Sequence, residues 1–155
     1  MSAGRVVLST IDDTQELGRA LGGLLREGDL VVLTGDLGAG KTTLTQGIAE
    51  GLGVRGPITS PTFVIARVHP SLVDGPALVH VDAYRLGSAL ELDDLDLDAD
   101  LDESVTVVEW GAGLAEQLSE SRLELTIVGD DVRTARLVGV GERWDAVLDA
   151  VAPAR

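Results

Sequence analysis

The residues with the clearest chemical meaning lie between Gly35 and Thr42, in the run Gly-Asp-Leu-Gly-Ala-Gly-Lys-Thr. This run fits the pattern G-x-x-x-x-G-K-[ST] at every defined position. Its glycines permit backbone conformations in which successive N–H groups point at phosphate oxygens. Lys41 is expected to reach the β- and γ-phosphates of a nucleotide, and the Thr42 hydroxyl to bind Mg²⁺. A glycine turn that binds nothing is the alternative. Lys41 is the only lysine in the chain, and its place in the full pattern favours a phosphate loop.

Two acidic residues are candidates for the metal and water chemistry that accompanies a phosphate loop. Asp82 follows the apolar run 78–81, and Glu109 follows the run 105–108. Ligands gather at the carboxyl ends of strands in open α/β sheets, so both are well placed. In a chain with 26 acidic residues, ordinary strand-terminal acids are the alternative. Position alone does not divide the roles between the two.

Three other features carry weaker signals. His80 could act as a base, but a single histidine in a strand is more often a packed structural residue. Thr62 follows Pro61 between the loop helix and the next strand, where nucleotide switch segments are often found; on the residues alone, a proline turn is favoured. The acidic stretch 91–103 is interpreted as a solvated helix face or loop rather than a cation site.

The spacing of apolar residues predicts elements that place the loop between a strand and a helix. Leu30 to Leu33 is a continuous apolar run typical of a buried strand, and a helix is expected from Thr42 to Leu52. An earlier helix is expected to be capped by Asp12 or Asp13 and ended by Gly28. Further strands are predicted at 5–8, 63–68, 77–81, 105–108, 123–128 and 133–140, and helices at 112–118 and around 144–151. The close spacing of 63–68 and 77–81 indicates a hairpin. The expected fold is α/β: a single P-loop NTPase domain, 1–155, with a mixed parallel and antiparallel sheet flanked by helices.

Composition limits the partners that the chain can bind. The net charge of -14 disfavours direct binding to RNA or DNA, because the overall field repels phosphate backbones. The chain has no cysteine and no apolar run of membrane-spanning length, so a cytoplasmic protein without a membrane partner is expected. It also has no asparagine, which excludes the Asn-Lys-x-Asp motif of guanine-specific switches. ATP is therefore the expected nucleotide.

Four short motifs occur in order along the chain: Gly-Asp-Leu-Gly-Ala-Gly-Lys-Thr-Thr at 35–43, Ser-Pro-Thr-Phe at 60–63, His-x-Asp-x-Tyr-Arg at 80–85 and Val-Glu-Trp at 108–110. Together they resemble the TsaE (YjeE) family over nearly the whole chain. The resemblance implies a single α/β domain with a mixed sheet that binds ATP and Mg²⁺.

The resemblance also implies roles for individual residues. Thr42 and Glu109 would hold the metal, and the catalytic residues would be Lys41, Asp82 and Thr62, with Asp82 acting in hydrolysis and Thr62 as a switch residue. The nucleotide would be bound by Gly35, Asp36, Leu37, Gly38, Ala39, Gly40, Lys41, Thr42 and Thr43, with Thr14 and Arg133 near the base or phosphates and Trp110 beside the nucleotide site.

The family's activity gives the functional expectation. Its members work with the partner proteins TsaB and TsaD, which transfer threonylcarbamoyl to the adenosine next to the tRNA anticodon. ATP hydrolysis by the TsaE subunit would drive or reset that complex, and tRNA would be met only through the partners. A stand-alone P-loop kinase acting on a small metabolite is one alternative, and a regulatory nucleotide-binding module with negligible hydrolysis is another.

Overall fold

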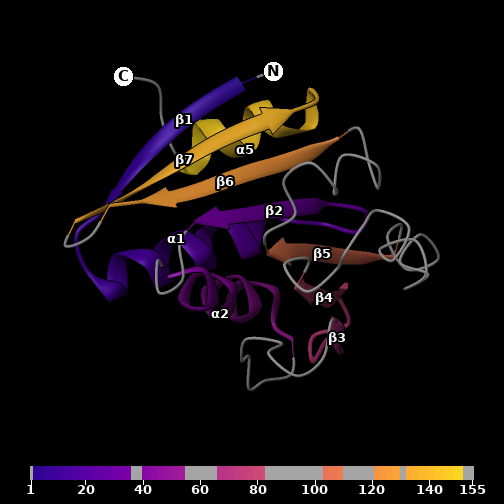
Figure 1. Cartoon of the computed structure of the whole chain (residues 1–155). Coiled ribbons are helices and arrows are strands. Elements are labelled where there is room, and N and C mark those ends of the chain that lie inside the picture. Colours follow the sequence, from indigo (N-terminus) through magenta and orange to yellow (C-terminus); the bar gives the residue numbers. More distant parts are fainter. Residues whose placement is uncertain are drawn as a thin grey trace.

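The computed structural model describes residues 2–35, 40–54, 66–82, 103–109, 121–129 and 132–151. Within these ranges the chain forms a seven-stranded sheet and three helices (Figure 1). The strands are β1 (Ser2–Leu8), β2 (Leu30–Gly35), β3 (Ala66–His69), β4 (Ala77–Asp82), β5 (Ser104–Glu109), β6 (Arg122–Val128) and β7 (Arg133–Val140). The helices are α1 (Ile11–Leu24), α2 (Lys41–Leu52) and α5 (Arg143–Val151). The expected α/β fold with a mixed sheet is confirmed.

The order of the strands is β1-β7-β6-β2-β5-β4-β3. The four central strands, β6, β2, β5 and β4, run parallel to one another, whereas β7, β1 and β3 add antiparallel pairs at the two sides. The predicted hairpin is confirmed as the antiparallel pair β3–β4, although residues 63–65 lie outside the described part of the chain. Because β2, β4 and β5 are parallel, their carboxyl ends share one edge of the sheet.

The same edge also receives the start of α1 and the start of β7. Strand β7 is antiparallel to β6, so its first residue, Arg133, lies where the parallel strands end. Strand β1 is antiparallel to β7, with Leu8 opposite Arg133, so the chain leaves β1 at this edge and enters α1 there. Topology alone therefore brings five separate segments of the chain to the carboxyl edge of the central strands.

One continuous core joins the three helices to a single face of the sheet. Apolar residues at alternate positions of β2, β5 and β6 pack with the inner faces of α1, α2 and α5, and Trp144 is the largest fully buried side chain among the described residues. The core is built mainly from Leu, Val and Ile, as a chain with 3% aromatic residues requires. In β2, β4 and β5 the intervening residues Val32, Val79 and Val108 face the opposite side and are also buried. Burial on both faces explains the unbroken apolar runs in the sequence.

The boundaries of α1 differ from those predicted. Thr10, rather than Asp12 or Asp13, is the N-cap: its hydroxyl accepts a hydrogen bond from the Asp13 N–H, while the Asp13 carboxylate accepts one from the Thr10 N–H. Asp13 is thus the third helical residue of a capping box. The helix ends at Leu24, four residues before Gly28, because Leu25 already has an extended backbone.

Helices α1 and α2 lie side by side and touch through their backbones (Figure 1). Gly18 and Gly22 of α1 face Gly47 and Gly51 of α2. A Cβ atom at Gly22 would lie 2.3 Å from the Ile48 carbonyl oxygen, and one at Gly47 would lie 2.4 Å from that of Gln15. Only glycine permits this approach, which fixes the loop helix α2 against α1.

Candidate nucleotide site

The phosphate loop connects the end of β2 to the start of α2. Residues 36–39 lie outside the described part of the structure, so Asp36, Leu37, Gly38 and Ala39 are not placed, but both ends of the loop are. Gly35 closes β2, and Gly40 is the N-cap of α2 with a φ of 102°. That left-handed conformation favours glycine, which accounts for the last glycine of the motif.

The first turn of α2 has no side-chain cap. Glycine at the N-cap has no side chain to accept hydrogen bonds from the first N–H groups, in contrast to the capping box on α1. Helix N-termini carry partial positive charge and orphan N–H donors, which together bind anions. The start of α2 therefore has the properties that a phosphate group requires. Thr42 and Thr43 lie in this turn and are partly exposed.

The Lys41 side chain reaches back to the end of β2. Its Nζ donates a hydrogen bond of 2.7 Å to the carbonyl oxygen of Gly35, and only 6% of the residue is exposed. The ammonium group is thus held beside the point where the loop leaves β2. A buried lysine needs polar partners because desolvating its charge is costly. The Gly35 carbonyl supplies one of them.

Thr14 and Arg133 lie next to Gly40. A Cβ atom on Gly40 would be 3.1 Å from Nη1 of Arg133 and 3.8 Å from Cγ2 of Thr14. Thr14 is in the first turn of α1 and is 3% exposed, and Arg133 begins β7. These two residues reach the loop from different elements because β1 and β7 both bring the chain to this edge of the sheet.

Asp82 and Glu109 end neighbouring parallel strands in register with each other. Glu109 is also opposite Leu33 of β2, two residues before Gly35, and is 4% exposed. Both lie at the carboxyl ends of their strands, as expected, and each is the last residue of its strand. The side chain of Asp82 lies outside the described part of the structure, as do Thr62 and Trp110.

The Glu109 carboxylate has a partner that the sequence did not indicate. His80 Nε2 lies 2.5 Å from Glu109 Oε2, and the side chains are 0% and 5% exposed, respectively. His80 is therefore a packed, hydrogen-bonded residue, as expected for a single histidine in a strand. Its partner, however, is one of the two candidate acids. No sequence signal identifies this contact, because it depends on β4 and β5 being neighbours.

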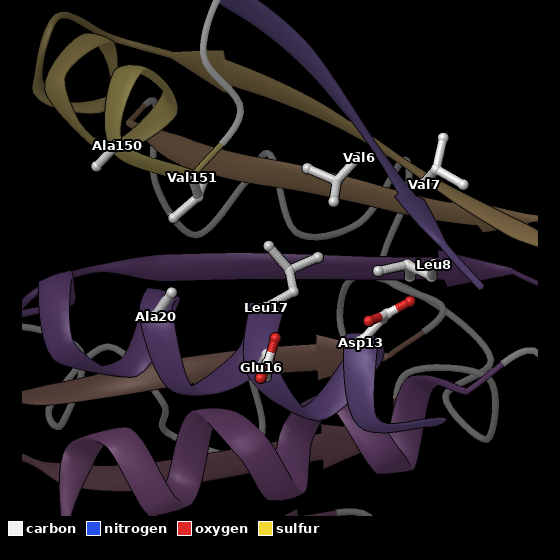
Figure 2. A pocket seen from close by; sticks show the side chains of 9 residues that line it. All are labelled: Val6, Val7, Leu8, Asp13, Glu16, Leu17, Ala20, Ala150 and Val151. Atoms are coloured by element: carbon white, nitrogen blue, oxygen red, sulfur yellow. The ribbon is translucent and has the colours of Figure 1, made fainter. Parts of the chain in front are cut away.

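A cavity of about 300 Å³ lies elsewhere, between β1, α1 and the end of α5 (Figure 2). Its lining is apolar except for two acidic side chains: Val6, Val7, Leu8, Asp13, Glu16, Leu17, Ala20, Ala150 and Val151. None of the described phosphate-loop residues lines this cavity, and its two carboxylates would repel phosphate. The cavity therefore does not suit the phosphates of a nucleotide.

Two further findings concern the described ranges as a whole. Within them, no helix is long and apolar enough to cross a membrane. Across the same ranges, no three His, Asp or Glu side chains gather into a group that could hold a metal ion by themselves.

Strand β2, the glycine-rich loop and helix α2, with acidic residues ending β5 and β4 on one side of β2, define a P-loop α/β domain. The family described as "Threonylcarbamoyl adenosine biosynthesis protein TsaE" matches residues 8–138. The chain belongs to this TsaE family.

The similarity to individual relatives supports this family assignment. The chain is 64% identical over 137 residues to a tRNA threonylcarbamoyladenosine biosynthesis protein TsaE of Streptomyces coelicolor, covering 84% of this chain and 93% of the relative. It is 38% identical over 142 residues to the Bacillus subtilis protein of the same name, covering 89% and 87%. The crystal structure of Bacillus subtilis YdiB superposes with a TM-score of 0.77 at 32% identity, covering 97% of this chain and 94% of that one.

Proposed function

We propose that this chain is the ATP-hydrolysing subunit of the machinery that installs threonylcarbamoyl on the adenosine next to the tRNA anticodon. The observation that supports this most is the gathering of Lys41, the uncapped start of α2 and the carboxylate of Glu109 at one edge of the sheet. The names of its relatives supply the pathway. In this proposal residues 1–155 act as one domain in the cytoplasm.

The loop and α2 would bind the phosphates of ATP. Backbone N–H groups between Gly35 and Thr43 would contact phosphate oxygens, and Lys41 would exchange its bond to the Gly35 carbonyl for one to the γ-phosphate. Thr14 and Arg133 lie close enough to Gly40 to contact the same nucleotide. Trp110, which follows Glu109 in sequence, would lie beside the base.

Hydrolysis would proceed by in-line attack of water. A bond forms from the water oxygen to the γ-phosphorus as the bond to the β,γ-bridging oxygen breaks, and ADP leaves with that electron pair. The proton lost by the water ends on the released phosphate. Asp82 would orient the water, and Thr62 would respond to the γ-phosphate as a switch residue. Lys41 and the loop N–H groups would stabilise the charge that develops on the transferred group.

The residues at the edge also suit Mg²⁺. This ion prefers oxygen ligands and is usually held by one or two protein groups together with substrate phosphates. The Thr42 hydroxyl and the Glu109 carboxylate are such groups, and Glu109 has one oxygen that His80 does not occupy. When bound, the ion would neutralise charge on the β- and γ-phosphates.

TsaD and TsaB are the proposed partners, and tRNA would be reached only through them. The net charge of -14 supports this division, since this chain would repel a tRNA backbone at long range. Hydrolysis would then drive or reset the partner complex between turnovers. DNA and membranes have no part in the proposal.

Phosphate release from ATP, measured for the chain alone, with TsaB–TsaD, and with tRNA added, tests the proposal. We expect partner-stimulated release into water and no phosphorylated metabolite. Lys41→Ala should lower turnover by about 100-fold or more, the cost of losing one electrostatic contact to the transition state. Arg136→Ala is the matched control, because it removes one positive charge from an exposed position of β7. Phosphate transfer to a small molecule, or binding without turnover, would contradict the proposal.

A further inference from the structure

The contact between His80 and Glu109 is the most deeply buried contact between a carboxylate and a histidine or arginine side chain in the described part of the chain. The side chains are 0% and 5% exposed, whereas those of Arg143 and Asp29, which form the next most buried pair, are 18% and 7% exposed. The contact crosses two parallel strands diagonally. In the ladder His80 is opposite Val107, so its ring reaches forward by two residues, towards the carboxyl edge, to meet Glu109.

Fold stability does not explain this pair. It lies among apolar strand residues, with Leu33 opposite Glu109 and Val107 opposite His80. Replacing a buried ionic pair by well-packed apolar residues is often neutral or stabilising. In addition, His80 Nδ1 is buried and has no hydrogen-bond partner among the residues that the structure describes, which costs further stability. A costly polar pair at the edge where the phosphate loop begins indicates a functional requirement.

We propose that His80 is a positioning residue that fixes the carboxylate of Glu109. The imidazole Nε2–H of His80 donates a hydrogen bond to Oε2 of Glu109. This bond fixes the position of Oε2 and the rotamer of the Glu109 side chain, and it leaves Oε1 for the cation that accompanies the nucleotide. Carboxylates that bind metals are commonly oriented by such outer hydrogen bonds. This inference rests on the proposed function only in assigning the cation to Glu109; the hydrogen bond itself does not depend on it.

Glutamine and asparagine at position 80 distinguish positioning from packing. The amide nitrogen of Gln lies near the place of the imidazole Nε2 and can still donate to Glu109, whereas the amide of Asn lies near Nδ1 and falls short. We expect His80→Asn and His80→Ala to weaken Mn²⁺ binding by about 10- to 100-fold, the usual effect of losing an outer partner of a metal ligand. His80→Gln should stay within a few-fold of the unaltered chain.

The measurement is Mn²⁺ affinity, by electron paramagnetic resonance, of the full chain saturated with a non-hydrolysable ATP analogue. Analogue affinity without metal should change less than twofold in every variant. His69→Gln is the control, because it alters the other histidine of the chain, on β3. Equal Mn²⁺ affinity in His80→Asn and the unaltered chain would overturn the inference and leave the ATPase proposal intact. An unaltered chain that binds the analogue but no Mn²⁺ would overturn both.

A second measurement needs no variant and therefore covers the case in which His80→Asn and His80→Ala do not fold. With only two histidines, ¹⁵N-histidine labelling gives a simple spectrum. We expect the His80 Nε2–H signal to persist when Mg²⁺ and the analogue are added, and Mn²⁺ in place of Mg²⁺ to broaden the His80 ring signals more than those of His69. Loss of the Nε2–H signal on adding Mg²⁺ and analogue, or equal broadening of both rings, would overturn the positioning role.

Discussion

Replacing Gly22 by Ala places a methyl group where the backbone of α2 already lies. The new Cβ would be 2.3 Å from the Ile48 carbonyl oxygen and 2.8 Å from the Gly51 Cα. Both neighbours are backbone atoms of a helix, so neither can move aside without moving α2. Overpacking costs about 1–3 kcal/mol of stability in typical cores. Because the new methyl group would meet rigid backbone, we expect a cost of about 3 kcal/mol.

Gly23→Ala is a matched control on the same helix. Gly23 is exposed, and a Cβ there meets nothing within 4 Å. Both substitutions gain the same helix propensity, roughly 1 kcal/mol for Gly to Ala in a helix interior. That gain cancels between the two variants, so the difference in their unfolding free energies isolates the steric term of about 3 kcal/mol.

Urea unfolding followed by circular dichroism measures this difference. We expect Gly22→Ala to be destabilised by about 2 kcal/mol and Gly23→Ala to be stabilised by up to about 1 kcal/mol. In a domain of this size the two Tm values should then differ by about 6–12 °C. Equal stability of the two variants would refute the close backbone contact between α1 and α2.

Three other substitutions test separate parts of the fold and site. Thr10→Ala removes the N-cap hydroxyl of α1 and should cost about 1 kcal/mol in the same unfolding assay. Arg143→Leu leaves the Asp29 carboxylate, 7% exposed, without its 2.9 Å partner, and should cost about 3 kcal/mol; an unchanged urea midpoint would show that the pair contributes nothing. Gly40→Ala puts a side chain at φ 102° and a Cβ 3.1 Å from Arg133, so it should lose about 1–2 kcal/mol and weaken binding of the ATP analogue measured by calorimetry. Undiminished affinity for the analogue would show that nucleotide binding does not depend on the backbone conformation of Gly40.

The sequence predicted the elements well where one local signal was sufficient. The apolar runs around Val32 and Val107 identified β2 and β5, because a strand buried on both faces has few polar positions. The motif predicted a helix from Thr42, one residue after the observed start of α2 at Lys41, because strand, glycine loop and helix form one local unit. The boundaries of α1 were less accurate, because Thr10 and Asp13 are both good capping residues and only backbone geometry decides between them.

Contacts between distant segments could not be predicted in this way. His80 and Glu109 are 29 residues apart, and their contact depends on β4 and β5 being neighbours, which periodicity does not reveal. The four-residue spacing of glycines in α1 and α2 was visible in the sequence, but each glycine is simply unfavourable for an isolated helix. Only the packed structure shows that Gly18 and Gly47 are needed for two backbones to meet.

The solitary lysine has a practical consequence for chemistry carried out on this protein. Apart from the α-amino group, Lys41 is the only amine in the chain, and it is 6% exposed with its Nζ bonded to the Gly35 carbonyl. Acylating reagents and cross-linkers that attack lysine therefore have a single side-chain target, and it lies within the phosphate loop. A modification located on the Lys41 side chain reports directly on the accessibility of that residue, so the chain contains its own single side-chain probe.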